Sequence, residues 1–122
     1  MEMPLPEILD RMSIVKLKIE RIGEPQLKDE YAQYEKALED YAKVGIKMKK
    51  EWLDNLYKIN AQIWDLESDI RKGKENELGL KEVGRRAILI RELNKKRIAV
   101  KNEIVEKTGI GFKDIKMNHA SE

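Results

Sequence analysis

The sequence predicts an all-α fold of four antiparallel helices. Apolar residues recur at steps of three and four in four separate stretches, and no stretch shows the alternation typical of a β-strand. Proline or glycine stands between these stretches, where helices begin and end. The connections are only a few residues long. Short connections favour antiparallel neighbours that pack at a shallow angle, as helices do in coiled-coil-like bundles.

The first helix is expected at residues 6–22 and the second at 25–44. Pro6 suits a first helical turn, Gly23 ends the first helix, and Pro25 begins the second. The apolar stripe of the first helix is Ile8, Met12, Val15, Ile19 and Ile22. The stripe of the second is Leu27, Tyr31, Tyr34, Leu38 and Tyr41.

The third helix is expected at 47–72 and the fourth at 80–108, joined by the polar turn GKENELG into a hairpin. At 1.5 Å per residue this hairpin would be roughly 40 Å long. Gly73 and Gly109 suit the ends of the two helices. We expect the first two helices to pack across the hairpin. Residues 1–122 would form one domain, and residues 110–122 a partly flexible C-terminal arm.

Composition excludes several classes of protein. The chain has no cysteine, so it can form no disulfide and no thiolate metal site. The first ten residues lack the pattern of a signal peptide, and no apolar run approaches the ~18 residues of a membrane span. We therefore expect a cytoplasmic protein that does not insert into membranes. Charged residues make up 39% of the chain, but the net charge is only +2.

The charges are unevenly distributed along the chain. Residues 24–41 contain six acidic residues and two lysines, whereas residues 80–108 contain nine Lys or Arg and four Glu. Such helices would attract each other, within the fold or across a dimer. Nucleic-acid binding by the basic helix is disfavoured because glutamates interrupt its basic residues and no aromatic residue on it could stack a base.

Polar residues fall on helix faces that the apolar stripes predict to be buried. At about 100° per residue, Asn60, Trp64, Glu67 and Arg71 lie near the buried side of the third helix, which is centred on Ile63. Asp65 and Asp69 fall near the opposite side. In the first helix, Glu7, Arg11 and Lys18 lie on the packing flank, and Asp10 is expected to point towards the edge or solvent. In the fourth helix, the stripe is interrupted by Asn94, Arg97 and Lys101.

Two interpretations fit these polar residues, because unpaired charge in a core costs several kcal/mol. In the first they form a structural layer: Glu67 pairs with Arg71 and reaches Arg86, and Arg97 meets an acid such as Glu7. In the second they line a cleft for an anionic ligand. Arginine suits phosphate or carboxylate, and Trp64 would supply a flat wall. The residues of that cleft would be Arg11, Asn60, Trp64, Glu67, Asn94 and Arg97.

Three blocks of the chain carry a family resemblance: EILDRMSIVKLKIERI at 7–22, INAQIWDLESDIRKGKE at 59–75 and ELNKKRIAVKNEIVEKTG at 92–109. They resemble a family of small helical bacterial and phage proteins of unknown function, some of them associated with glycosyltransferases. That family has the motifs E-I-x-D-[KR]-[LM]-S-I, N-x-x-[LI]-W-[DE]-[IL]-E-x-x-I-R and N-x-K-R. Lys95 stands where the family tends to have an acid. The resemblance implies a helical fold with a motif-bearing cleft, and no catalytic residue. The candidate polar cluster, as a binding site or a buried layer, is Glu7, Asp10, Arg11, Asn60, Trp64, Glu67, Arg71, Asn94 and Arg97.

Two functions remain open from the sequence. The first is a non-enzymatic interaction or accessory module, homodimeric or bound to another protein, which the resemblance links to glycosyltransferase-type enzymes. The second is a small binder or enzyme for an anionic ligand such as a nucleotide or nucleotide sugar. No cofactor is expected for the first. Mg²⁺ belongs only to the second, since helical enzymes of this kind hold it with acid pairs. The chain has such a spacing at Glu7–Asp10 and at Glu51–Asp54, but in a chain with 23 acids it arises readily by chance, and Glu51 and Asp54 are expected to point outward.

Overall fold

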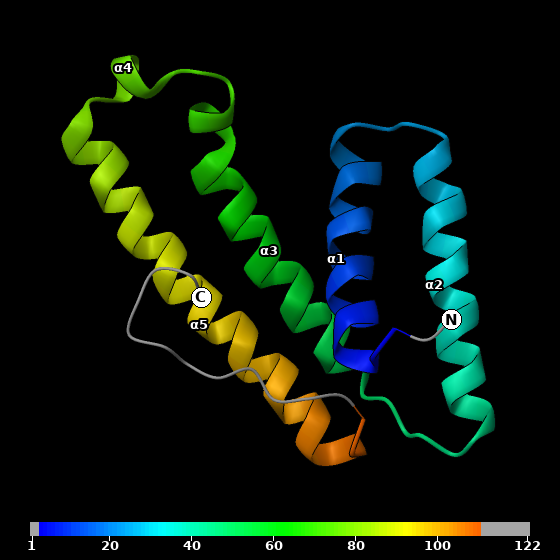
Figure 1. The fold of residues 1–122 in the computed structure, drawn as a ribbon. Coiled ribbons are helices and arrows are strands. Elements are labelled where there is room, and N and C mark those ends of the chain that lie inside the picture. Colours follow the sequence, from blue (N-terminus) through cyan, green and yellow to red (C-terminus); the bar gives the residue numbers. More distant parts are fainter. Residues whose placement is uncertain (1–2, 111–122) are drawn as a thin grey trace.

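The computed structural model describes residues 3–110, which form four long helices, one single-turn helix and no strand (Figure 1). The predicted all-α class is confirmed. The helices are α1 (Leu5–Arg21), α2 (Gln26–Lys43), α3 (Lys50–Arg71), α4 (Glu75–Leu78) and α5 (Leu80–Thr108). The expected C-terminal arm falls almost wholly outside the described residues.

The predicted helix boundaries are correct to within one residue, except at two connections. The third helix begins at Lys50 rather than at 47, because Gly45, at a φ of 89°, ends α2 and an extended segment follows it. Ile46 and Met48 in that segment pack against the core. The predicted polar turn GKENELG contains the single-turn helix α4, which lies between Gly73 and Gly79.

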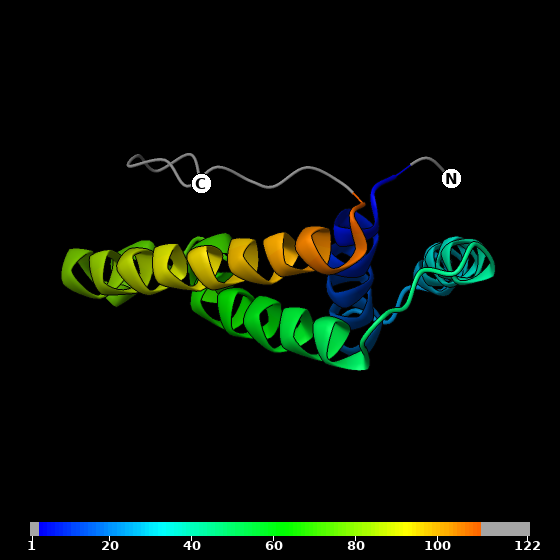
Figure 2. The same cartoon turned by 90° about the horizontal axis from the view of Figure 1, so that it is seen from below.

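The chain folds into two antiparallel helical hairpins, α1/α2 and α3/α5, with α1 at the junction (Figure 1). α1 packs against α2 on one side and against α3 and α5 on the other. α2 packs almost entirely on α1 and stands apart from the second hairpin (Figure 2). The prediction that both of the first two helices pack across the α3/α5 hairpin is therefore wrong for α2. The buried residues of α2 are only Leu27, Tyr34 and Ala37, a stripe narrow enough for one neighbour.

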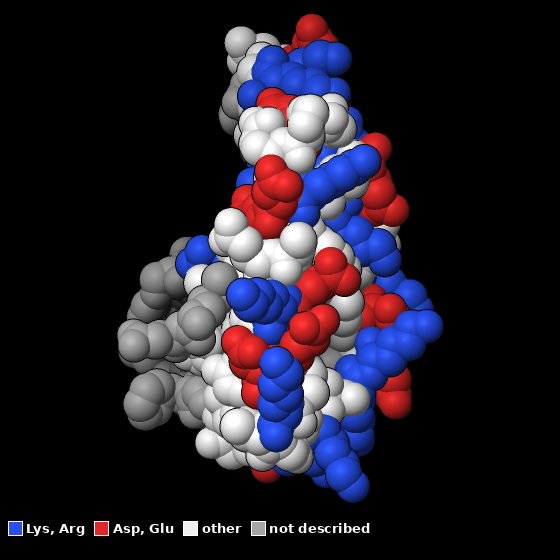
Figure 3. Space-filling model, turned by 90° about the vertical axis from the view of Figure 1, so that its right-hand side faces the viewer, with Lys and Arg blue, Asp and Glu red and all other residues white. Residues whose placement is uncertain are grey.

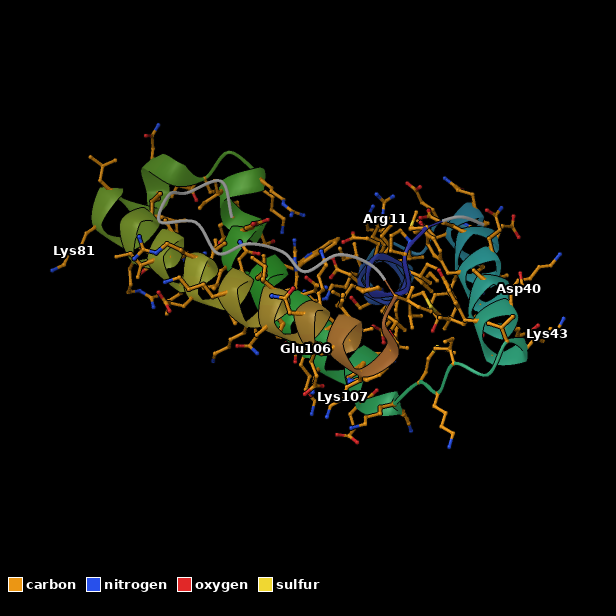
Figure 4. All side chains as sticks on the ribbon, turned by 60° about the horizontal axis from the view of Figure 1, so that its bottom comes forward. Arg11, Asp40, Lys43, Lys81, Glu106 and Lys107 are labelled. Carbon is orange, nitrogen blue, oxygen red and sulfur yellow. The ribbon has the colours of Figure 1, made fainter. Side chains whose placement is uncertain are left out.

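The expected attraction between the acidic second helix and the basic fourth is not realised inside the fold, because α2 and α5 do not pack together. The side of the molecule on which α2 lies carries a mixture of acidic and basic side chains rather than a patch of one sign (Figure 3). Asp40 and Lys43, for example, both project outward from the end of α2 (Figure 4).

The main core lies where both hairpins meet, around Trp52 at the start of α3. Trp52 is 1% exposed, and its indole Nε1 donates a hydrogen bond of 2.7 Å to Oε2 of Glu103 on α5. Leu56 and Ile104 are fully buried beside it. This core joins all four long helices, with the buried residues Leu5, Ile8, Leu9, Met12, Val15, Leu27, Tyr34, Ala37, Trp52, Leu56 and Ile104.

A smaller core of Ile59, Ile63 and Leu93 holds the middle of the α3/α5 hairpin together. Towards α4 the hairpin is held by an ion pair between Arg86 of α5 and Asp69 of α3, at 3.2 Å. Within α5, Arg86 also pairs with Glu82 at 2.7 Å. Hydrogen bonds from Arg85 and Arg86 lower the pKa of the Glu82 carboxyl to about 2. The predicted contact between Glu67 and Arg86 is wrong, because Asp69 occupies that position across the hairpin.

Within residues 3–110, no helix combines the length and the apolar character that crossing a membrane requires.

Candidate functional site

A buried polar network connects α1 to α3 next to the small core. The side-chain amide Nδ2 of Asn60 donates to Oδ1 of Asp10 at 3.0 Å and to Oγ of Ser13 at 2.7 Å. The Ser13 hydroxyl donates in turn to the backbone carbonyl of Asp10 at 2.6 Å. All three residues are at most 5% exposed. Both protons of the amide are used, so these hydrogen bonds satisfy the groups that the two helices bury between them.

Arg97 of α5 reaches this network but is poorly satisfied by it. Its Nη1 donates a long hydrogen bond of 3.4 Å to Oδ1 of Asn60. Its Nε lies 3.8 Å from Oδ2 of Asp10, which is an ionic contact beyond hydrogen-bond distance. That Nε is buried and has no hydrogen-bond partner in the described part of the chain. A buried donor without a partner costs stability, so the guanidinium retains unused capacity to bind an acceptor.

A cleft of about 490 Å³ opens beside Arg97, between α1, α3 and α5. Its lining includes polar side chains, among them Lys18, Asn94 and Arg97, and apolar ones such as Ile14, Leu17 and Ile63. The lining residues are Ile14, Leu17 and Lys18 from α1, Asn60, Ile63, Trp64, Glu67 and Arg71 from α3, and Asn94 and Arg97 from α5.

The rim of the cleft is built around the half-buried indole of Trp64. Arg71 and Arg21 lie over its ring, with their guanidinium carbons 5.3 Å and 5.8 Å from the ring centroid. Arg71 also pairs with Glu67 one turn earlier, as the sequence predicts, and Arg21 pairs with Asp65 at 2.5 Å. These contacts hold Trp64 in place at the mouth of the cleft.

The cleft is electropositive. Its lining contains three cations, Lys18, Arg71 and Arg97, and one carboxylate, Glu67. Within residues 3–110, the side chains of Lys18 and Asn94 have no hydrogen-bond or ion-pair partner. The unused groups of the site are therefore mainly donors, supplied by α1 and α5. A site with this balance suits an acceptor-rich anion.

Six of the nine candidate residues from the sequence line this cleft: Asn60, Trp64, Glu67, Arg71, Asn94 and Arg97. Asp10 lies directly behind it at 5% exposed, so the prediction that Asp10 points towards the edge or solvent is wrong. Glu7 lies nearer the start of α1 than Asp10 does, and it pairs with Lys101 at 2.6 Å. The acid next to Arg97 is thus Asp10 and not Glu7.

Arg11 does not belong to the cleft. It is exposed and projects from the outer side of α1 (Figure 4). The apolar stripe through Val15 marks only one edge of the buried face, because α1 has neighbours on two sides. Leu9 and Leu17, which lie off that stripe, are 3% and 1% exposed. The true buried face is rotated towards them, which turns Asp10 inward and Arg11 outward.

Lys18, Ile14 and Leu17 line the cleft but were not candidate site residues. Ile14 and Leu17 lie beside the predicted stripe rather than in it, and this could have shown that α1 is buried on a second side. Lys18 lies on the same flank as Arg11, two turns further along the helix. The sequence contains no signal that would have predicted which of these two cations lines the cleft and which is exposed to solvent.

The two acid pairs considered for Mg²⁺ do not converge. In the first pair, Glu7 forms an ion pair with Lys101, and Asp10 accepts a hydrogen bond from Asn60. In the second pair, Glu51 and Asp54 are both exposed on α3. In the part of the chain that the structure describes, no three acidic or histidine side chains come close enough together to hold a metal ion.

Comparisons of the chain with family models, with curated proteins and with solved structures give no match. The resemblance seen in the three sequence blocks stays a prediction.

Proposed function

We propose that the protein binds a small anionic ligand in the cleft between α1, α3 and α5. The observation that carries this proposal is the state of Arg97. Asn60 holds one end of its guanidinium, while its buried Nε has no hydrogen-bond partner in residues 3–110 and the side chain lines the cleft. A bound phosphate or carboxylate would supply acceptors to Arg97, Lys18 and Asn94.

The polar residues divide into two groups, and only one group supports ligand binding. Asp10, Ser13 and Asn60 form a closed set of hydrogen bonds that a purely structural layer would also have. Lys18, Asn94 and Arg97 are not closed in this way. A layer that served structure alone would pair its cations closely with acids inside the protein. Arg97 instead meets Asp10 only at 3.8 Å, and its buried Nε lacks a hydrogen bond within residues 3–110.

The proposal is tested by thermal denaturation with millimolar pyrophosphate. Pyrophosphate is expected to raise the melting temperature of the wild-type protein, because a ligand that binds only the folded state stabilises it. In Arg97→Met, affinity is expected to fall by about 10- to 100-fold, from the loss of hydrogen bonds to a charged group. Circular dichroism would verify that the variant is folded.

The matched control is Arg91→Met, which removes an exposed arginine from the same helix at a position outside the cleft. It should leave the response to pyrophosphate unchanged. Equal losses in the two variants would mean that the anion binds the basic surface of α5 non-specifically. An unchanged response in Arg97→Met would contradict the proposed site.

A second candidate function, a self-associating accessory module, is favoured by the opposite face of the α3/α5 hairpin. A groove of about 400 Å³ lies there, with Leu66, Leu89 and Leu93 among its lining residues. Leu89 is 39% exposed and the neighbouring Ile88 is 54% exposed. A two-helix hairpin covers only one side of each helix, so a second copy that packed on this face would complete a four-helix arrangement.

Self-association through this groove predicts a dimer that Leu89→Lys disrupts. Sedimentation equilibrium at micromolar concentrations should show a dimer for the wild-type protein and a monomer for the variant, because a lysine would be desolvated in the contact. The control is Val44→Lys, at a residue that is 74% exposed and far from the groove. A wild-type monomer, or a Leu89→Lys dimer, would exclude this interface.

A further inference from the structure

The cleft combines a cationic part with an apolar part, and this combination narrows the ligand class. Lys18, Arg71 and Arg97 line it, and Glu67 is the only carboxylate that residues 3–110 contribute to the lining. Next to these charges lie Ile14, Leu17, Ile63 and Trp64. A bare inorganic anion would use the first part and leave the second in contact with water. A ligand with both a charged group and an apolar body would use the whole volume of about 490 Å³.

The charge balance favours a ligand with two negative charges. The lining residues carry three positive charges against one negative. Counting Asp10, which lies behind Arg97 at 3.8 Å, still leaves the balance positive. Each additional negative charge on a ligand therefore gains attraction rather than repulsion, and in a partly enclosed cleft that attraction is screened less than it is in open water.

The arrangement of the donors favours a tetrahedral group over a planar one. Lys18 approaches from α1, Asn94 and Arg97 from α5, and Arg71 from α3. A carboxylate has two oxygens, which accept hydrogen bonds in directions close to one plane. A phosphate monoester has three acceptor oxygens that point in different directions, so it can meet donors from more than one helix.

Resting on the function proposed above, we propose that the ligand is a phosphate monoester of an apolar or aromatic alcohol. Its dianionic phosphate would lie among Lys18, Asn94 and Arg97. Its organic group would lie along Ile14, Leu17, Ile63 and Trp64. Phosphate ester dianions of this kind are distinguished from sulfate esters by charge and from carboxylates by both charge and shape.

The test compares four small probes by isothermal titration calorimetry on the full-length protein: phenyl phosphate, phenyl sulfate, benzoate and inorganic phosphate. At pH 7.5 we expect phenyl phosphate to bind about tenfold or more tighter than phenyl sulfate and benzoate, because one extra charge close to the cations is worth that factor. We expect it to bind about tenfold tighter than inorganic phosphate as well, because only phenyl phosphate also buries apolar surface in the cleft. Phenyl sulfate has the same shape with one charge, and inorganic phosphate lacks the apolar body. Each probe thus removes one feature of the proposed ligand.

The dependence of binding on pH separates the ligand's charge from that of the protein. The second pKa of a phosphate monoester is about 6, so at pH 5 phenyl phosphate is mainly a monoanion. Its advantage over phenyl sulfate should then disappear. The charged groups facing the site are Lys18 on α1, Glu67 and Arg71 on α3, and Arg97 on α5, with Asp10 behind them. The Arg21–Asp65 ion pair lies at the rim beside Trp64. A pH response that phenyl sulfate shares would come from these groups and would count against the proposal.

A charge-removing variant provides an independent check. Lys18→Gln is expected to reduce the preference for phenyl phosphate over phenyl sulfate by several-fold, because it removes one positive charge and keeps a hydrogen-bonding side chain. Its control is Lys16→Gln, since Lys16 lies over the ring of Tyr57, 4.7 Å from the centroid, and does not line the cleft.

The outcomes distinguish the two proposals. If benzoate or phenyl sulfate binds as tightly as phenyl phosphate, the cleft is an anion site and the phosphate-monoester inference is wrong. If inorganic phosphate binds as tightly, the apolar wall takes no part and the inference is also wrong. If none of the four probes binds while pyrophosphate still raises the melting temperature through Arg97, the inference alone fails. If pyrophosphate has no effect either, the proposed function fails with it.

Discussion

Replacing Trp52 by alanine is expected to lower the free energy of unfolding by about 3 to 5 kcal/mol, the usual range for removing a large buried aromatic side chain. Trp52 is 1% exposed at the point where the two hairpins meet. The substitution removes its apolar contacts and its hydrogen bond to Glu103. The cavity cannot close easily, because α1, α2, α3 and α5 all contribute residues to this core.

The measurement is urea denaturation, followed by far-ultraviolet circular dichroism. The matched control is Trp64→Ala, which makes the same chemical change at a half-buried position on the same helix. We expect a smaller loss there, because Trp64 is less buried than Trp52 and lies at the mouth of the cleft rather than in the core. If the two substitutions cost the same, the core around Trp52 is not packed as the structure describes.

Replacing Asn60 by leucine is expected to cost about 3 kcal/mol, even though leucine is apolar and similar in size. The substitution removes the hydrogen bonds that Asp10 and Ser13 receive from the amide. The carboxylate of Asp10 would remain buried, with Arg97 at 3.8 Å as its nearest cation. Leaving a buried charged acceptor unsatisfied costs more than the net gain from an ordinary hydrogen bond.

The double variant Asp10→Leu/Asn60→Leu separates this explanation from simple misfit. Removing both partners together takes away the unsatisfied charge, so we expect the pair to be more stable than Asn60→Leu alone in the same urea titration. Gln62→Leu, at an exposed position on the same helix, controls for the change in composition. Additive losses in the double variant would mean that Asp10 and Asn60 do not interact.

Much of the fold could be predicted because local patterns decide it. Steps of three and four between apolar residues locate all four long helices, and Gly109, at a φ of 72°, ends α5 where the sequence predicts. The face of α3 that carries Asn60, Trp64, Glu67 and Arg71 was predicted from Ile63 alone. This worked because the apolar residues of α3 mark one continuous face, and the polar residues beside it must lie at its edge.

By itself, the sequence determined the number of long helices, most of their limits and the polar positions on α3 and α5, because these depend on spacing within one helix. Only the tertiary structure decided which residues of α1 belong to the site. α1 is packed by α2 on one side and by α3 and α5 on the other, so one apolar stripe could not show the width or the direction of its buried face. For this reason Asp10 is buried and Arg11 exposed, and Lys18 is brought to the cleft. Which helices touch is a property of the whole chain, and no spacing within α1 contains it.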